Sequence, residues 1–356
     1  MRPVWQALAW TGGVVGAAVT GAVVGVAAHS TRAQRRSDGA LLDEKPGGLL
    51  PDRQSTVAAD DGVPLAVQEV GPLDGGAAEL TVVLVHGYAM DSRCWHFQRR
   101  DLPELTGPRV RLVLYDQRSH GRSGQSSRSG STIDQLGRDL DAVLRATAAS
   151  GPVVLVGHSM GGMTIMALAE QRPELFRGRV RGVALIGTSA GAVGAAGLSR
   201  PWLSRYNPIT RGLSMVVGVQ PALVERIRRT GDPLARTLIR RLGFADRDVS
   251  PAVVDLVAEM IGATSVEVVT DFLETIGTHD RRAALAALAE CEVLVLAGDS
   301  DRITPFSHAE VIAGELPTAE LVQVESAGHP VMLERHEVVT EQLVALIRRA
   351  YAGEER

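Results

Sequence analysis

The chain has 356 residues, of which 45% are hydrophobic and 22% charged, and its formal net charge is −4. This composition is typical of a globular protein with a large core, and the negative charge argues against a nucleic-acid partner. The two cysteines, Cys94 and Cys291, match no metal-binding spacing, so we expect both to be buried apolar residues.

Residues 1–30 differ from the rest of the chain. Val4–Ala28 carries no charge and consists mainly of Ala, Val and Gly, and a helix of about 25 residues is long enough to span a bilayer. Because three arginines follow this run, the positive-inside rule predicts an uncleaved membrane anchor with the downstream domain in the cytoplasm. The alternatives are a secretory signal cleaved near Val26–Ala28, after which the domain is secreted, and a weakly apolar disordered arm.

A polar linker is expected over residues 31–54, and apolar runs rich in β-branched residues then alternate with helical segments. Strands are predicted at Ser55–Ala59, Leu65–Val70, Thr81–Val85, Val110–Tyr115, Val153–Val156, Val180–Ile186, Glu292–Ala297 and Glu320–Val324. The first two are joined through Asp60-Asp61-Gly62 as a β-hairpin. The alternation predicts an α/β fold, in which helices cover both faces of a mostly parallel sheet.

The strand at Val153–Val156 runs into Gly157-His158-Ser159-Met160-Gly161, and a helical segment follows from Met163 to Gln171. A serine on so sharp a strand-to-helix turn is strained and exposed, and the flanking glycines let the turn close. The helix N-terminus directs N–H groups at whatever binds over the serine. The pattern indicates a nucleophile elbow with Ser159 as nucleophile, although so short a pattern also arises by chance.

A second loop at the same edge of the predicted sheet begins after Val85. The N–H of Tyr88 is expected beside Ser159, where it and the N–H of Met160 are placed to hold a developing oxyanion. We interpret His86 as a structural residue that orients this loop, because its spacing suits no role as a base.

The loop after Tyr115 carries Asp116, Arg118 and His120. We expect Asp116 and Arg118 to brace neighbouring loops through hydrogen bonds. His120 has no evident partner in the sequence, so we assign it no catalytic role. Trp95 is expected to lie in the core.

The last two predicted strands are followed by Asp299, Asp301 and His329. A serine hydroxyl is a poor nucleophile until a base takes its proton, and a histidine base needs a carboxylate that fixes its tautomer. Both aspartates follow the end of a strand, at the edge where such sites form. The chain order of serine, then aspartate, then histidine is that of one fold in particular.

From about Ser55 to Arg349 the chain resembles the α/β-hydrolase superfamily, and in particular its serine hydrolases with a mobile cap. The motifs that carry the resemblance are His86-Gly87, Asp116-x-Arg118-x-His120-Gly121-x-Ser123, Gly157-His158-Ser159-Met160-Gly161-Gly162, Gly298-x-x-Asp301-x-x-x-Pro305 and Gly328-His329. They are specific for the fold and its catalytic triad, and only weakly specific for the substrate.

The resemblance implies that Ser159 is the nucleophile, Asp301 the acid and His329 the base, with the N–H groups of Tyr88 and Met160 as oxyanion donors. It implies neither a metal nor an organic cofactor. A serine at the elbow argues against epoxide hydrolases and dehalogenases, which carry a nucleophilic aspartate there.

The family also bears on the choice between the two aspartates. It places its acid four residues before a proline, as Asp301 stands before Pro305, which favours Asp301 over Asp299. Two departures from the family pattern are Ser119, where glycine is usual, and His336, where proline is common. Neither position touches the inferred chemistry.

The alternation is interrupted between Ile186 and Cys291. About 100 residues separate two consecutive strands, far more than a crossover helix needs. Amphipathic helical spacing occurs at Pro221–Arg229, Pro233–Leu242 and Pro251–Ile261. We therefore predict a helical cap over residues 188–288, inserted into a hydrolase core of residues 55–187 and 289–352. The arginines of the insertion form either a solvated face or a surface for an anionic lipid or a carboxylate-bearing substrate, and they include Arg226, Arg228, Arg229, Arg240 and Arg241.

The predicted activity is hydrolysis of carboxylic esters, lipid-like or small, through an acyl-enzyme. On the same triad the alternatives are an acyltransferase, a cofactor-free perhydrolase or haloperoxidase, and a carbon–carbon bond hydrolase. From a different class, the alternative is a non-catalytic, membrane-tethered binding protein that retains the fold. The sequence specifies neither the acyl chain nor the head group of the substrate, and it does not specify the oligomeric state.

Overall fold

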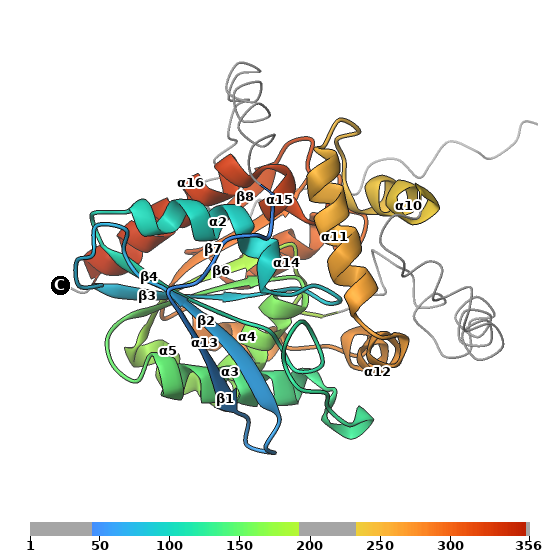
Figure 1. Cartoon of the computed structure of the whole chain (residues 1–356). Coiled ribbons are helices and arrows are strands. Elements are labelled where there is room, and N and C mark those ends of the chain that lie inside the picture. Colours follow the sequence, from blue (N-terminus) through green and yellow to red (C-terminus); the bar gives the residue numbers. More distant parts are fainter. Residues whose placement is uncertain (1–44, 192–232, 354–356) are drawn as a thin grey trace, which may run out of the picture.

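The computed structural model describes residues 45–191 and 233–353, and at its centre lies an eight-stranded sheet with the order β1-β2-β4-β3-β5-β6-β7-β8 (Figure 1). The strands are β1 (Arg53–Ala58), β2 (Pro64–Val70), β3 (Leu80–Val85), β4 (Val110–Tyr115), β5 (Val153–His158), β6 (Val180–Ile186), β7 (Glu292–Gly298) and β8 (Glu320–Val324). β2 runs antiparallel to both β1 and β4, and all other neighbouring strands are parallel. The predicted mostly parallel sheet is confirmed.

The burial of each strand explains its sequence. β3 and β5 are buried along their whole length, and a strand covered on both faces is a continuous apolar run. β1 lies at the edge of the sheet, and Arg53, Gln54, Thr56 and Ala58 are exposed. It begins at Arg53, inside the predicted linker, because Arg53 and Gln54 pair with Glu69 and Gln68 of β2.

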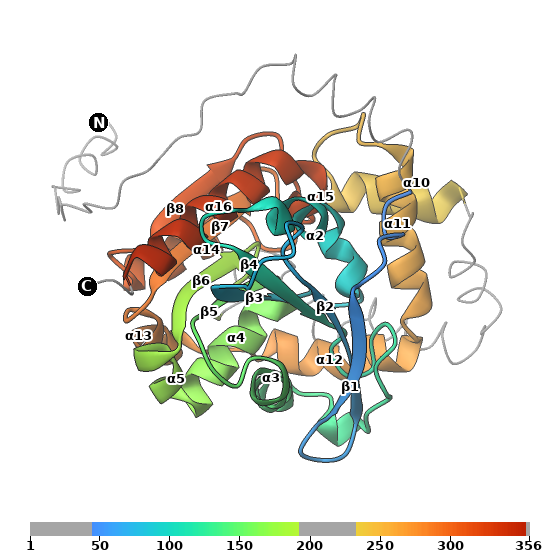
Figure 2. The ribbon, with the colours of Figure 1, turned by 60° about the vertical axis from the view of Figure 1, so that its left-hand side comes forward.

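Helices cover both faces of the sheet (Figures 1 and 2). On one face pack α2 (His96–Asp101), α15 (Val331–Glu334) and α16 (His336–Ala352). On the other face pack α3 (Ile133–Thr147), α4 (Met160–Gln171), α5 (Pro173–Gly178), α13 (Leu285–Leu288) and α14 (Ser307–Glu315). Because successive side chains of a strand point to opposite faces, Leu84 packs in the first layer and Val85 in the second. Short 3₁₀ turns occur at Ser92–Trp95, Leu102–Glu104, Arg128–Gly130 and Arg282–Ala284.

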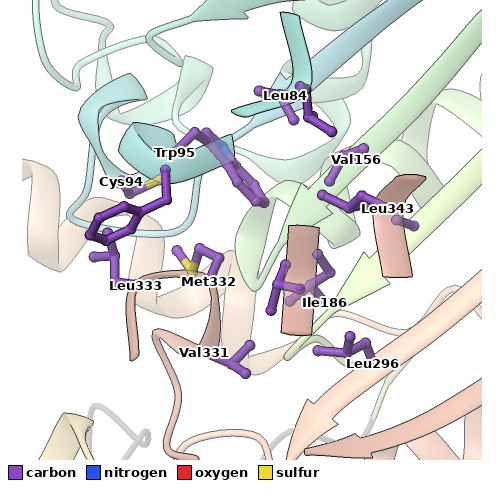
Figure 3. Packing of buried hydrophobic residues seen from close by; sticks show 14 of the residues in the cluster. Leu84, Cys94, Trp95, Val156, Ile186, Leu296, Val331, Met332, Leu333 and Leu343 are labelled. Atoms are coloured by element: carbon purple, nitrogen blue, oxygen red, sulfur yellow. The ribbon is translucent and has the colours of Figure 1, made fainter. Parts of the chain in front are cut away.

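Figure 3 shows the packing of the first layer, in which Trp95 joins Met332 and Leu343 in one cluster. Trp95 is fully buried, as predicted. Burying such side chains stabilises the fold by roughly 1.5–3 kcal/mol each. Cys94 and Cys291 are buried and form no disulfide, which confirms the sequence expectation.

Between β6 and β7, before α13, the described residues form α10 (Pro233–Gly243), α11 (Pro251–Ala263) and α12 (Val266–Gly277), which lie to one side of the sheet in Figure 1. α12 packs against Met160 at the start of α4. α10 and α11 correspond to two of the predicted helical segments. α12 was not predicted, and the third predicted segment, Pro221–Arg229, lies outside the described residues.

The predicted membrane anchor, Val4–Ala28, also lies outside the described residues. Across residues 45–191 and 233–353, no helix combines the length and the apolar character that crossing a membrane requires.

Candidate active site

Ser159 occupies the sharp turn between β5 and α4. Its backbone has φ 51° and ψ −117°, a conformation that non-glycine residues rarely adopt and that costs about 1–3 kcal/mol. A Cβ atom on Gly161 would lie 2.2 Å from the carbonyl oxygen of Val85, and one on Gly157 would lie 2.6 Å from the backbone of Gly161. Only glycine fits at these two positions, and this close packing holds Ser159 in its strained conformation.

His329 and Asp301 form a hydrogen-bonded pair in the loops after β8 and β7. The Nδ1 of His329 lies 2.8 Å from Oδ2 of Asp301. Since a carboxylate only accepts, Nδ1 carries the proton, and the Nε2 lone pair is left to act as a base. The pair is almost completely buried, with exposed fractions of 6% for His329 and 5% for Asp301.

Neighbouring groups lock the carboxylate of Asp301. Its Oδ1 accepts the N–H groups of Ile303 at 2.8 Å and Thr304 at 2.9 Å, and its Oδ2 accepts the hydroxyl of Thr304 at 2.9 Å. Burial by itself raises the pKa of Asp301, but the charge and hydrogen bond of His329 and these N–H groups outweigh it and lower that pKa. Asp301 is therefore ionised at neutral pH. Thr304 is a member of this cluster that sequence reasoning missed.

His158 connects the elbow to the loop that carries His329. Its Nε2 donates to the carbonyl oxygen of His329 at 2.9 Å, and the centres of the two rings lie 4.7 Å apart. Burial and the neighbouring imidazole lower the pKa of His158 to about 3, so it is neutral. Because His158 directly precedes Ser159, this bond brings the elbow alongside His329. The hydrogen bonds among the described residues do not include one from the Ser159 hydroxyl to His329 itself.

Asp299, the rival acid, has a different neighbourhood. Its carboxylate accepts the backbone N–H groups of Ser326 at 3.0 Å and Ala327 at 3.3 Å. It therefore braces the loop that leads to His329, while Asp301 is the aspartate in contact with the imidazole.

The two predicted oxyanion donors belong to segments that adjoin Ser159. Met160 is the first residue of α4, and the loop containing Tyr88 approaches so closely that a Cβ on Gly87 would lie 3.2 Å from Cβ of Ser159. Neither N–H, of Tyr88 or of Met160, donates to an acceptor within the part of the chain that the structure describes. The side chain of Tyr88 points elsewhere, since its hydroxyl donates to the carbonyl of Val269 on α12.

His86 and His120 serve the loops around the site. Nε2 of His86 accepts the N–H of Gln117 at 2.8 Å, so Nδ1 carries the proton and donates to the carbonyl of Gly87 at 2.8 Å. This arrangement confirms the structural interpretation of His86. Nδ1 of His120 donates to the carbonyl of Arg118 at 2.9 Å, and burial lowers the pKa of His120 to about 3.

Asp116 and Arg118 brace loops, as predicted. Asp116 accepts the N–H groups of Ser92 and Arg122, each at 2.9 Å. Arg118 is fully buried and forms ion pairs with Asp139 at 2.6 Å and with Asp61 at 2.7 Å. No group of three or more His, Cys, Asp or Glu side chains among the described residues is arranged to hold a metal ion.

A model of the alpha/beta hydrolase family matches residues 82–342, and the chain belongs to this family. Its relatives have diverse activities. The dihydrolipoyllysine-residue acetyltransferase component of the acetoin cleaving system of Pseudomonas putida is 28% identical over 77% of this chain, which spans 65% of that protein's length. The sn-1-specific diacylglycerol lipase ABHD11 of Mus musculus is 25% identical over 72% of this chain and 77% of its own length. The non-heme chloroperoxidase of Streptomyces lividans is 26% identical over 82% of this chain and 99% of its own length.

Solved structures share the fold. A thermophilic esterase from Thermogutta terrifontis superposes with a TM-score of 0.63 at 24% identity, over 84% of this chain and 99% of the esterase. A membrane phospholipase A superposes with a TM-score of 0.63 at 23% identity, over 89% of this chain and 92% of that protein. Esterases and lipases among these relatives support hydrolase activity, and their diversity leaves the substrate open.

Proposed function

We propose that the protein is a serine hydrolase that cleaves carboxylic esters through an acyl-enzyme. The observation that carries this proposal is the strained Ser159 at the elbow, connected through His158 to the buried His329–Asp301 pair. Such a group of residues supplies a nucleophile, a base and a carboxylate that orients the base.

In the proposed first step, Nε2 of His329 takes the proton of Ser159 as Oγ attacks the ester carbonyl. Asp301 stays ionised and stabilises the imidazolium, and the N–H groups of Tyr88 and Met160 hold the oxyanion. Collapse of the tetrahedral intermediate expels the alcohol, which takes the proton from His329. Water, deprotonated by His329, then attacks the acyl-enzyme in the same way and releases the acid.

The test is covalent labelling with a fluorophosphonate, followed by peptide mapping and a panel of 4-nitrophenyl esters of increasing acyl length. Labelling of Ser159 with turnover of at least one ester is the expected result. Ser159→Ala is the matched control and must lose the label. A correctly folded protein that neither reacts with the probe nor turns over any ester would refute the proposal and favour a binding protein.

Transfer of the acyl group to an acceptor other than water is a second candidate. The names of two relatives support it, since one is an acetyltransferase component and the other a non-heme chloroperoxidase. Product analysis with water, an alcohol or peroxide as competing acceptors separates the candidates. If the amounts of acid, new ester and peracid simply follow the concentrations of water, alcohol and peroxide, the protein is a hydrolase. If one acceptor other than water is strongly preferred, the protein is a transferase or a perhydrolase.

We also propose that Val4–Ala28 anchors the protein in a membrane with the hydrolase domain in the cytoplasm. The support is its uncharged sequence and the arginines that follow it. Fractionation of a C-terminally tagged protein tests this proposal. Full-length protein in the soluble cytosolic fraction would contradict it, and a shortened product outside the cell would indicate a cleaved signal.

A further inference from the structure

A cavity of about 740 Å³ opens between α10, the loop after α10 and the loop after β7. Phe244 and Ala245 form an apolar part of its wall, and Phe244 is buried. The other lining residues are mainly cationic, and the arginines among them are Arg236, Arg240, Arg241, Arg247 and Arg302. No acidic side chain lines the cavity within the described residues.

Most of this positive charge has no protein counter-charge. Arg236 pairs with Asp255 at 2.9 Å. The other four arginines have no carboxylate within ion-pair distance in the described part of the chain. The nearby Asp246 is paired with Arg335 at 3.2 Å.

Backbone contacts hold two of these side chains beside the cavity. The guanidinium of Arg240 donates to the carbonyl of Arg247 at 2.7 Å, and that of Arg302 donates to the carbonyl of Arg241. These bonds orient cations without neutralising them, and like charges held close together repel. By contrast, the buried Arg118 contacts two aspartates. An anion in the cavity removes the repulsion.

The cavity adjoins the candidate triad along two parts of the chain. Arg302 directly follows Asp301, whose carboxylate contacts His329 at 2.8 Å. Phe244 directly follows Gly243, whose carbonyl accepts the N–H of His329 at 2.8 Å. Two residues that line the cavity are therefore chain neighbours of residues that contact the proposed base, His329.

We propose that this cavity binds an anionic carboxylate or phosphate group of the substrate, so that the protein prefers esters that carry a negative charge remote from the scissile bond. The proposal rests on the proposed ester hydrolysis and names its substrate class. Arginine suits this role, because its planar fork binds carboxylate and phosphate through paired hydrogen bonds. The apolar wall accommodates the chain that joins the charge to the ester.

The test compares mono-4-nitrophenyl esters of dicarboxylic acids of increasing length with the same compounds capped as methyl esters. We expect kcat/KM for the anionic ester of the best length to exceed that of its neutral partner at least tenfold, mainly through KM. The preference should shrink as salt rises, because the charges are exposed and are screened.

The double variant Arg241→Gln/Arg247→Gln tests the cavity directly. Neither guanidinium makes a hydrogen bond or ion pair within the described residues, so their removal does not threaten the fold. We expect the ratio of kcat/KM between anionic and neutral esters to fall about tenfold or more, as the loss of hydrogen bonds to a charged group predicts. Arg348→Gln, on the exposed side of α16, is the matched control and should retain the ratio.

Sedimentation with vesicles distinguishes the source of the anion. Phosphatidylglycerol vesicles that bind the wild type more tightly than the double variant, without a preference among soluble esters, assign the anion to a lipid head group. Equal use of both soluble esters, with vesicle binding unchanged in the variant, overturns the inference while ester hydrolysis itself stands. Absence of all ester turnover refutes the hydrolase instead, and the vesicle comparison then still decides whether the cavity binds anions.

Discussion

At the edge of the sheet, Asp301 is buried and accepts hydrogen bonds from His329, Thr304 and Ile303. In the helical insertion beyond that edge, Arg241 and Arg247 are exposed, and neither has a carboxylate partner within the described residues. The first arrangement holds each group in one position, which a chemical step common to all substrates requires. The second leaves charge available to a ligand, which selection among substrates requires. We therefore assign the proposed ester cleavage to the cluster around Asp301 and the proposed selection among substrates to the arginines of the insertion.

Ser159→Ala should have the largest effect and should act equally on every ester. We expect kcat to fall by about 10⁴-fold or more, because residues of a triad act as a unit. Initial rates on the neutral and anionic 4-nitrophenyl esters measure the loss, and circular dichroism checks the fold. Turnover close to the wild type would show that the nucleophile is another residue.

Asp301→Asn should be the next most damaging substitution. An amide in place of this carboxylate favours the wrong tautomer of His329, and we expect kcat to fall by about 10³–10⁴-fold for both esters. The matched control is Asp299→Asn, which changes a carboxylate that contacts only backbone N–H groups among the described residues. We expect this control to lose less than about tenfold in kcat, since the amide oxygen still accepts one of the two N–H groups and Asp299 does not contact His329. A larger loss of kcat in Asp299→Asn than in Asp301→Asn would show that Asp299 is the acid of the triad.

The loops around the site should make stability depend on pH. Burial lowers the pKa of His120 to about 3, so the folded protein resists its protonation while the unfolded chain takes up the proton below about pH 6.5. The free energy of unfolding should therefore fall as pH falls from about 6.5 toward 3, with His120 contributing about 1.4 kcal/mol per pH unit. Urea unfolding at several pH values measures the slope. His120→Asn keeps a donor for the carbonyl of Arg118 and should reduce the slope, and an unchanged slope would contradict burial of a neutral ring.

Tyr88→Phe tests the contact between the loop after β3, at the edge of the sheet, and α12 of the helical insertion. The variant removes the hydroxyl that bonds the carbonyl of Val269 on α12 and retains the backbone N–H of the proposed oxyanion hole. We expect KM to rise by about fivefold, the equivalent of one hydrogen bond of about 1 kcal/mol, with little change in kcat. A large loss in kcat with KM unchanged would indicate that the α12 contact positions the oxyanion donor.

Met160→Leu should have the smallest effect. Met160 is fully buried, so leucine preserves the packing volume that alanine would lose. The backbone N–H remains at the start of α4, and we expect kcat to stay within about threefold of the wild type. A loss of more than 100-fold in a folded variant would argue that the side chain, and not the N–H, is what matters at this position.

Much of the core could be read from local patterns. The strand at Thr81–Val85 was predictable because a parallel strand covered on both faces is continuously apolar. The turn at Ser159 was predictable because glycine alone fits its crowded neighbours. α12 was not predicted, although Ser265 caps it by accepting the N–H of Val268. Its place against Met160 depends on packing between segments far apart in the chain.

The sequence by itself determined the family, the mostly parallel sheet and the candidates Ser159, Asp301 and His329, because strand periodicity and turn chemistry are local properties of the chain. The family pattern favoured Asp301 over Asp299, but only the tertiary structure shows that Asp301 contacts the imidazole of His329. It also shows that His158 bonds the carbonyl of His329, 171 residues away. It also decided that arginines of the insertion and of a core loop share one cavity. Such contacts arise when separate elements pack, and no local pattern encodes them.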